Sequence, residues 1–168
     1  MVTYKGTIAI HWITALLIVI LFPLGKYMSG LEPSAKLWLI KIHGLLGMLI
    51  FILTIVRCVL FFTTKRPRHL STGSKFNDQL AVVIQRSFYI LLLIIGCSGI
   101  ATLILGGYVD ATIASPMSPE LILPRDEIGS LKIHSILAIM MMILIAMHIV
   151  GVIRFNIKNK INVIKRIS

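Results

Sequence analysis

Four of the five histidines lie inside long apolar stretches of the chain, and these are the residues best able to do chemistry. They are His11, His43, His134 and His148, whereas His69 lies in a basic segment and is expected to have no specific role. Polar side chains in hydrocarbon are costly and need partners. A histidine in a membrane span is therefore a functional-site hypothesis by default.

The spacing of these histidines predicts two pairs at two depths. His134 and His148 are 14 residues apart, about 21 Å along a helix and nearly four full turns, so they share one face. Antiparallel spans then place His11 with His148 near the inner surface and His43 with His134 near the outer one. Two bis-histidine haems would require this arrangement.

Other residues fit the same hypothesis. Arg57 follows His43 by 14 residues and would lie at the depth of the inner pair, where its guanidinium suits a haem propionate. Gly47, together with Gly44, Gly96 and Gly99, offers surface without side chains for a flat macrocycle. Glycines also serve plain helix–helix contact in membranes, which explains them equally well.

Three alternatives remain for the histidines themselves. They could be hydrogen-bonded packing residues, but four histidines that match in depth argue against this interpretation. They could bind Zn, Cu or Ni, which imidazole suits, although no carboxylate or thiolate accompanies either pair to complete such a site. They could form a proton relay, but relays usually recruit Asp or Glu and none of the apolar stretches contains either.

The elements that carry these residues are long and apolar. The chain has 168 residues, of which 57% are hydrophobic and 14% charged, and four stretches can cross about 30 Å of hydrocarbon. The expected spans are 8–24, 37–62, 80–105 and 131–153, with Pro23 and Gly25 among the residues that separate them. The first span lacks a cleavage site and is expected to be retained. We predict an all-α, integral membrane four-helix bundle forming a single domain, 1–168.

Charge predicts the orientation of this bundle. The side that holds both termini and the loop between the second and third spans has twelve basic residues, including Arg57 and Arg86 within the adjoining spans, and one acid, Asp78. This side therefore carries the whole net charge of +11. The opposite side holds five basic and five acidic residues. The positive-inside rule therefore makes both termini cytoplasmic. The basic face is interpreted as a topology signal and an attraction to anionic lipid, and no nucleic-acid partner is expected.

Side chains near the surfaces have less specific interpretations. Lys41 and Lys132 each precede a histidine by two residues and could place positive charge around the outer site, or could simply snorkel to the interface. Aromatic residues could line a quinone pocket or serve as interfacial anchors. These are Trp38 and Tyr108 near the outer surface, and Tyr4 and Trp12 near the inner one.

In combination, these motifs closely resemble the bacterial cytochrome b561 family. The resemblance rests on His11-Trp12, on His43 with Gly47 and Arg57, and on the His134–His148 spacing. It also includes Tyr89-Ile90-Leu91-Leu92 and Gly99, and extends from Ala9 to about Phe155. The resemblance implies a four-helix bundle in the bacterial inner membrane that binds two haems b. It implies His11 and His148 as ligands of the inner haem, and His43 and His134 as ligands of the outer.

The chain departs from the family at one position. Related sequences often have a histidine four residues before the tyrosine of the third span, where this chain has Gln85. Both histidine pairs are complete without that residue, so the expected number of haems stands. A propionate or quinone contact made by that histidine would be absent here.

The predicted function is one-electron transfer between an outer redox partner and the quinone pool. Some members of the family carry electrons between quinone and a partner, and one type is a superoxide:ubiquinone oxidoreductase. The loop 106–130 holds four acids against Arg125, which does not favour attraction of superoxide. The alternatives are an anchor subunit that relays electrons for a soluble dehydrogenase and, more remotely, a small non-redox membrane transporter.

Overall fold

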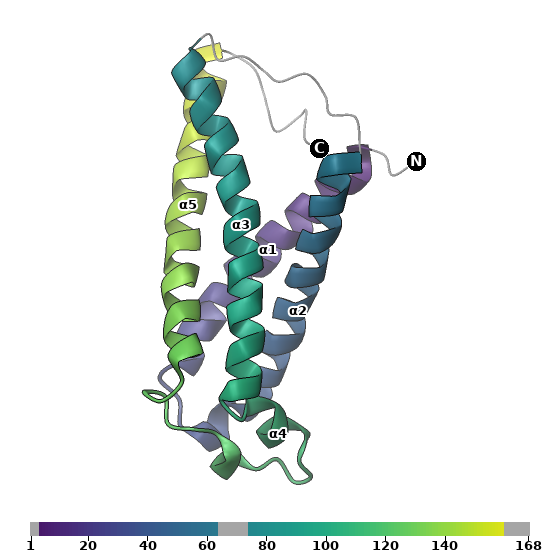
Figure 1. The fold of residues 1–168 in the computed structure, drawn as a ribbon. Helices are drawn as coiled ribbons and strands as arrows, with labels where there is room; N and C mark the ends of the chain where they lie inside the picture. Colours follow the sequence, from purple (N-terminus) through teal and green to yellow (C-terminus); the bar gives the residue numbers. More distant parts are fainter. Residues whose placement is uncertain (1–3, 64–73, 160–168) are drawn as a thin grey trace.

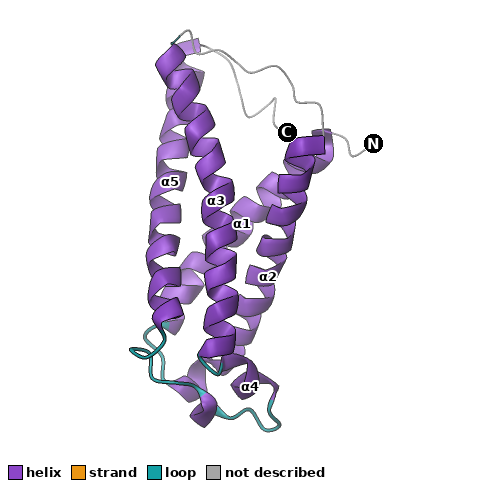
Figure 2. Ribbon diagram, in the orientation of Figure 1, coloured by secondary structure: helices purple, strands orange, loops and turns teal. Residues whose placement is uncertain are grey.

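The computed structural model describes residues 4–63 and 74–159 and contains four long helices. These are α1 (Tyr4–Met28), α2 (Pro33–Thr63), α3 (Lys75–Leu105) and α5 (Gly129–Asn159). All four are long and apolar enough to cross a membrane. The described residues contain no strand (Figure 2). The prediction of an all-α fold with four potential membrane spans is confirmed.

The helices are longer than the apolar stretches that predicted them. In particular, α1 continues through Pro23 to Met28, so the expectation that Pro23 and Gly25 separate two spans was wrong. A proline removes one helical hydrogen bond. Membrane helices tolerate this loss because neighbouring groups and local adjustments satisfy the freed carbonyl. His69 lies outside the described residues.

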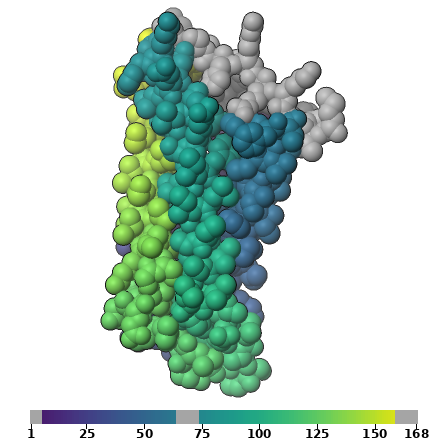
Figure 3. Space-filling model, viewed as in Figure 1, coloured from purple at the N-terminus to yellow at the C-terminus, as the bar shows by residue number. Residues whose placement is uncertain are grey.

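The four long helices follow a simple packing order. α1 packs on α2, α2 on α3, and α3 on α5. α3 and α5 lie side by side along their length (Figures 1 and 3). α1 runs diagonally behind α3, and α2 diverges from α5 toward the end of the bundle where α1 begins and α5 ends (Figure 1). We call this the terminus end.

The opposite end carries a small folded connection between α3 and α5, which we call the cap (residues 106–128). It contains α4 (Tyr108–Ile113) and η1 (Pro119–Leu121), neither of which the sequence predicted. Gly107 adopts a left-handed conformation with a φ of 72°, and a Cβ there would overlap the carbonyl oxygen of Leu121. Only glycine meets both demands, and this allows the cap to turn sharply and cover the bundle.

An apolar layer crosses the middle of the bundle. Each long helix contributes one buried side chain to it: Leu21, Ile50, Leu92 and Met141. Ile50 lies midway between His43 and Arg57 in the sequence, and Met141 lies midway between His134 and His148. We call these four residues the septum, because they separate the two depths at which the histidines lie. Outside the septum, large apolar side chains are exposed on all four helices, as contact with lipid requires.

Candidate functional site

Near the cap, His43 of α2 and His134 of α5 face each other. Their ring centroids are 6.3 Å apart and the ring planes are inclined by 75°. Metal–nitrogen distances of about 2.0 Å on each side, plus the size of each ring, place two imidazoles of one metal with centroids roughly 6 Å apart. The spacing between the two rings therefore fits a single metal ion bound between them.

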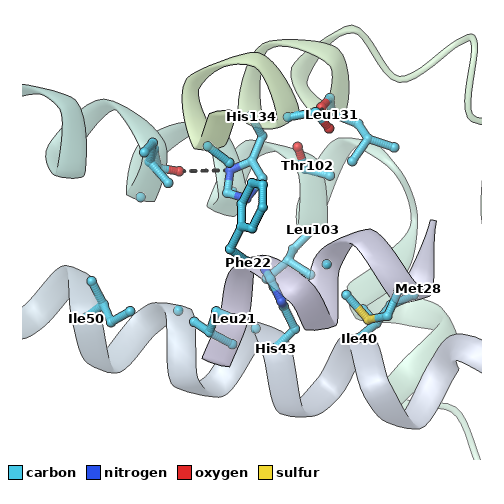
Figure 4. A pocket seen from close by; sticks show the side chains of 18 of the residues that line it. Leu21, Phe22, Met28, Ile40, His43, Ile50, Thr102, Leu103, Leu131 and His134 are labelled. Atoms are coloured by element: carbon cyan, nitrogen blue, oxygen red, sulfur yellow. Dashed lines mark hydrogen bonds between the residues drawn. The ribbon is translucent and has the colours of Figure 1, made fainter. Parts of the chain in front are cut away.

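The hydrogen bonds of His134 determine which of its nitrogens is free. Its Nδ1 atom is 3.1 Å from the carbonyl oxygen of Ile95 and 3.2 Å from the hydroxyl oxygen of Ser98. His134 and its hydrogen bond are drawn in Figure 4. A carbonyl oxygen only accepts, so Nδ1 carries the proton and Nε2 keeps its lone pair. Metal-binding histidines in proteins are commonly oriented by a bond of this kind.

Each histidine of this pair packs against a glycine on a neighbouring helix. A Cβ at Gly99 would lie 3.1 Å from Cε1 of His134, and a Cβ at Gly25 would lie 3.3 Å from Cε1 of His43. Any larger residue would press on the ring. Glycine at these two positions therefore lets both imidazoles occupy the interior of the bundle.

The other glycines near the pair divide into two kinds. A Cβ at Gly47 would meet nothing within 4 Å, whereas a Cβ at Gly96 would overlap the ring of Phe51. Gly47 therefore borders open space, and Gly96 provides room for a packed side chain. The sequence left two explanations for these glycines. The surroundings of Gly47 fit a surface for a macrocycle, and those of Gly96 fit close packing between helices.

A cavity of about 270 Å³ joins these features. It is lined by both histidines and by residues of the four long helices and the cap, in the region shown in Figure 4. The Nδ1 atom of His43 is buried without a hydrogen-bond partner among the described residues. Buried polar atoms normally have a partner. A cavity between two imidazoles, with a glycine wall and an unpartnered nitrogen, fits a haem group.

Three cationic residues line the cavity at the cap end. Lys26, Lys36 and Arg125 line the cavity, and Arg125 donates a hydrogen bond of 3.0 Å to the carbonyl oxygen of Ser29. Lys41 and Lys132 are exposed and are not among the lining residues. Each lies two residues before its histidine, and residues two apart point to different sides of a helix. Of the two interpretations of Lys41 and Lys132, their exposure fits side chains that snorkel to the interface.

Tyr108 and Trp38, the two aromatic residues expected near this end, differ in their exposure. Tyr108 lines the cavity and is buried. Burial raises the pKa of its phenol, while the charge of Arg125 acts in the opposite direction, so the phenol is neutral at physiological pH. Trp38 is 58% exposed, and Lys41 lies over its ring at 5.6 Å. Trp38 therefore fits the interfacial interpretation, whereas Tyr108 belongs to the cavity wall.

At the terminus end, His11 of α1 and His148 of α5 lie close enough to interact electrostatically, and Arg57 lies within range of both. These are the three residues that the sequence spacing brought to one depth. His11 is half-buried and His148 is exposed. The pair is more open than the one near the cap because the helices diverge toward this end (Figure 1).

Three aromatic side chains surround these residues. The ring of Trp12 lies 5.4 Å from that of His11, and the ring of Phe88 lies 5.5 Å from that of His148. The guanidinium carbon of Arg57 lies 5.4 Å from the ring centroid of Tyr89. No role was predicted for Phe88 or Tyr89 from the sequence. The available signal was Tyr89 itself, because a tyrosine within an apolar span needs a partner for its polar tip.

The donor set of the terminus-end pair also fits haem. The Nε atom of Arg57 is buried and has no hydrogen-bond partner among the described residues, which suits an anionic group such as a haem carboxylate. Within residues 4–63 and 74–159, no three His, Cys, Asp or Glu side chains converge as a protein-only metal site would require. Each pair thus offers two imidazoles as possible ligands. Gln85 is exposed on α3 and belongs to neither pair.

A membrane helix bundle with imidazoles facing each other in its interior has the architecture of a b-type membrane cytochrome. The sequence profile described as prokaryotic cytochrome b561 matches residues 3–168. The chain therefore belongs to the prokaryotic cytochrome b561 family and is a multi-pass membrane cytochrome that binds haem b. Searches of curated proteins and of solved structures found no significant match.

Proposed function

We propose that this cytochrome holds two haems b and transfers single electrons between a redox partner at the outer face of the membrane and the quinone pool. His43 and His134 would bind the first haem, and His11 and His148 the second. The observation that carries this proposal is the pairing of the four histidines at two depths, with the His43 and His134 rings 6.3 Å apart.

The residues of the chain have distinct tasks in this proposal. A bound haem supplies an iron that is oxidised and reduced by one electron. The hydrogen bond from His134 to Ile95 keeps the ligand nitrogen unprotonated, and Gly47 leaves space for the macrocycle. Arg57 at one site, and Lys26, Lys36 and Arg125 at the other, would neutralise the haem carboxylates.

The septum has the task of keeping the two sites apart. Its four residues are each at most 8% exposed, and further apolar side chains pack against them from all four long helices. A packed apolar layer offers water no hydrogen-bond partners. The septum would therefore exclude water and protons from the region between the two histidine pairs while electrons tunnel across it.

The orientation belongs to the same proposal. The beginning of α1 and the end of α5 lie at one end of the bundle (Figure 1), where the sequence concentrates its net positive charge. By the positive-inside rule this end faces the cytoplasm and the cap faces outward. We place the protein in the bacterial inner membrane as a single domain, 1–168.

The structure bears on the choice of electron donor. Three cations, Lys26, Lys36 and Arg125, line the cavity that reaches the cap-end pair. They would attract an anion, and this supports superoxide:ubiquinone oxidoreductase as the enzymatic function. Two superoxide anions would each lose one electron to give O₂, and one ubiquinone would take up both electrons and two protons. The alternative is an anchor subunit that relays electrons from a soluble dehydrogenase to quinone.

The first experiment measures haem content in purified protein by the pyridine haemochromogen spectrum. The expected stoichiometry is about two for the wild type, about one for His43→Ala or His11→Ala, and none for the double variant. His69→Ala is the matched control and should retain two. A colourless wild-type protein, or a double variant that loses one haem alone, would contradict the proposal.

A second experiment separates the two functions. Pulses of superoxide should reduce the haems within the mixing time, and ubiquinone should reoxidise them, if the protein is the oxidoreductase. Lys36→Glu should slow the reduction severalfold at low salt, because it reverses a charge at the cavity wall. Failure of superoxide to reduce the protein, with co-purification of a soluble dehydrogenase, would favour the anchor subunit.

A further inference from the structure

The ring of Tyr89 on α3 packs against the guanidinium of Arg57 on α2. The Tyr89 ring on α3 lies 5.4 Å from the guanidinium carbon of Arg57 and 5.4 Å from the ring of Phe61, which is one helical turn further along α2. Tyr89 therefore bridges α3 to two residues of α2. The contact with Arg57 is a cation–π interaction, which is strongest where water is excluded.

Arg57 needs such a contact to remain where it is. An arginine side chain is long and can snorkel toward the membrane surface, where water stabilises its charge. The Nε atom of Arg57 is nevertheless buried and has no hydrogen-bond partner among the described residues. The face of the Tyr89 ring contacts the guanidinium and holds it inside the bundle, near His11 and His148.

We propose that Tyr89 is a positioning residue that holds Arg57 beside the His11–His148 pair and thereby raises the redox potential of the haem bound there. The inference rests on the proposed function. A positive charge beside a redox centre favours its electron-rich state, and the protein tunes haem potentials through its surroundings in this way. Tyr89 would act through Arg57 and would not touch the haem itself.

The chain contains a matched control. Lys41 lies over the ring of Trp38 at 5.6 Å, which is also a cation over an aromatic face. Trp38 is exposed, and neither residue lines the cavity or belongs to either histidine pair. Loss of this ring should leave both potentials unchanged, so Trp38→Leu controls for the general effect of removing an aromatic residue.

The experiment is a potentiometric titration of the purified protein, followed in the haem spectrum. The component that belongs to the terminus-end pair is the one absent in His11→Ala. Tyr89→Leu should shift this component to a more negative potential, in the same direction as Arg57→Gln, while Tyr89→Phe and Trp38→Leu should not shift it. The double variant Arg57→Gln/Tyr89→Leu should shift no further than Arg57→Gln alone.

Several outcomes would overturn the inference. The inference fails if Tyr89→Leu binds two haems and leaves the potential of the terminus-end haem unchanged. It also fails if the shifts of the two single variants add in the double variant, because Tyr89 would then not act through Arg57. Tyr89→Met, which is also apolar and lacks a ring, replaces Tyr89→Leu if the latter does not fold. A Tyr89 variant that loses the haem outright would show a role in packing alone. A wild-type protein with fewer than two haems is a different result, because it contradicts the proposed function before the titration begins.

Discussion

At the scale of single residues, the cap-end pair depends on contacts between imidazoles and glycines. His43 packs on Gly25 and His134 packs on Gly99, each from a different helix. His134 is also held by the carbonyl oxygen of Ile95. An imidazole that ligates a metal must be kept in one orientation and one tautomer. The two glycines provide space for the imidazole rings, and the hydrogen bond of His134 keeps its proton on Nδ1.

Gly99→Val tests this contact. The new side chain would meet the His134 ring, because a Cβ alone already lies 3.1 Å from Cε1. The haem content should fall from about two to about one, with helix content unchanged in circular dichroism. Gly129→Val is the control, since a Cβ at Gly129 meets nothing within 4 Å. Two haems in Gly99→Val would show that the ring does not need this position.

Gly47 and Gly96 should respond in opposite ways. Gly47→Leu adds atoms to open space beside the cavity, so the bundle should remain as stable while the haem near the cap is lost. Gly96→Ala should destabilise the bundle by about 1–3 kcal/mol, because its methyl group overlaps the ring of Phe51. The measurements are haem content and the thermal unfolding midpoint of the haem-free protein in detergent. Equal effects of the two changes on stability would contradict this distinction.

At the scale of elements, the cap closes the end of the bundle through a single sharp turn. Tyr108, Ala111 and Ile128 of the cap are buried, and the amide of Leu123 donates a hydrogen bond to the carbonyl oxygen of Gly106, directly after α3. Arg125 adds a bond to the carbonyl oxygen of Ser29. The cap is therefore tied to the ends of both α1 and α3.

Gly107→Ala should loosen the cap. A non-glycine residue at a φ of 72° costs of order 1–3 kcal/mol, and here the Cβ would also overlap the Leu121 carbonyl. We expect a lower unfolding midpoint in detergent and faster tryptic cleavage after Arg125. Gly129→Ala, which introduces no contact, should match the wild type. Equal cleavage rates in the two variants would argue against a role for Gly107 in closing the cap.

At the scale of the whole molecule, orientation decides which site meets which partner. The proposed topology places the cap outside and both termini in the cytoplasm. It predicts that Glu120→Cys, in a background of Cys58→Ser and Cys97→Ser, reacts with a membrane-impermeant maleimide in spheroplasts. Lys158→Cys should react after the membrane is permeabilised and not before, because it lies at the terminus end of α5. The reverse pattern of labelling would invert the topology.

The sequence was sufficient to predict the class of fold and which histidines lie at the same depth. The length and apolarity of a stretch determine whether it can span a bilayer, and the helical rise determines the depth of each residue within it. Both quantities are local, so the meeting of His43 with His134 could be predicted without a structure. The same arithmetic placed Arg57 near His11 and His148. Haem binding at these residues stays a prediction.

Other features depend on how each helix is rotated and tilted against its neighbours. Lys26 of α1 and Lys36 of α2 line the cavity because these helix faces turn toward it, and Arg125 reaches it from the cap, while Lys41 and Lys132 turn out. Tyr89 meets Arg57 because α2 packs on α3 in one particular register. Apolar residues surround every helix, so hydropathy carries little information about rotation. The sequence thus determined the depth of each residue, and only tertiary packing decided which side chains at a given depth meet.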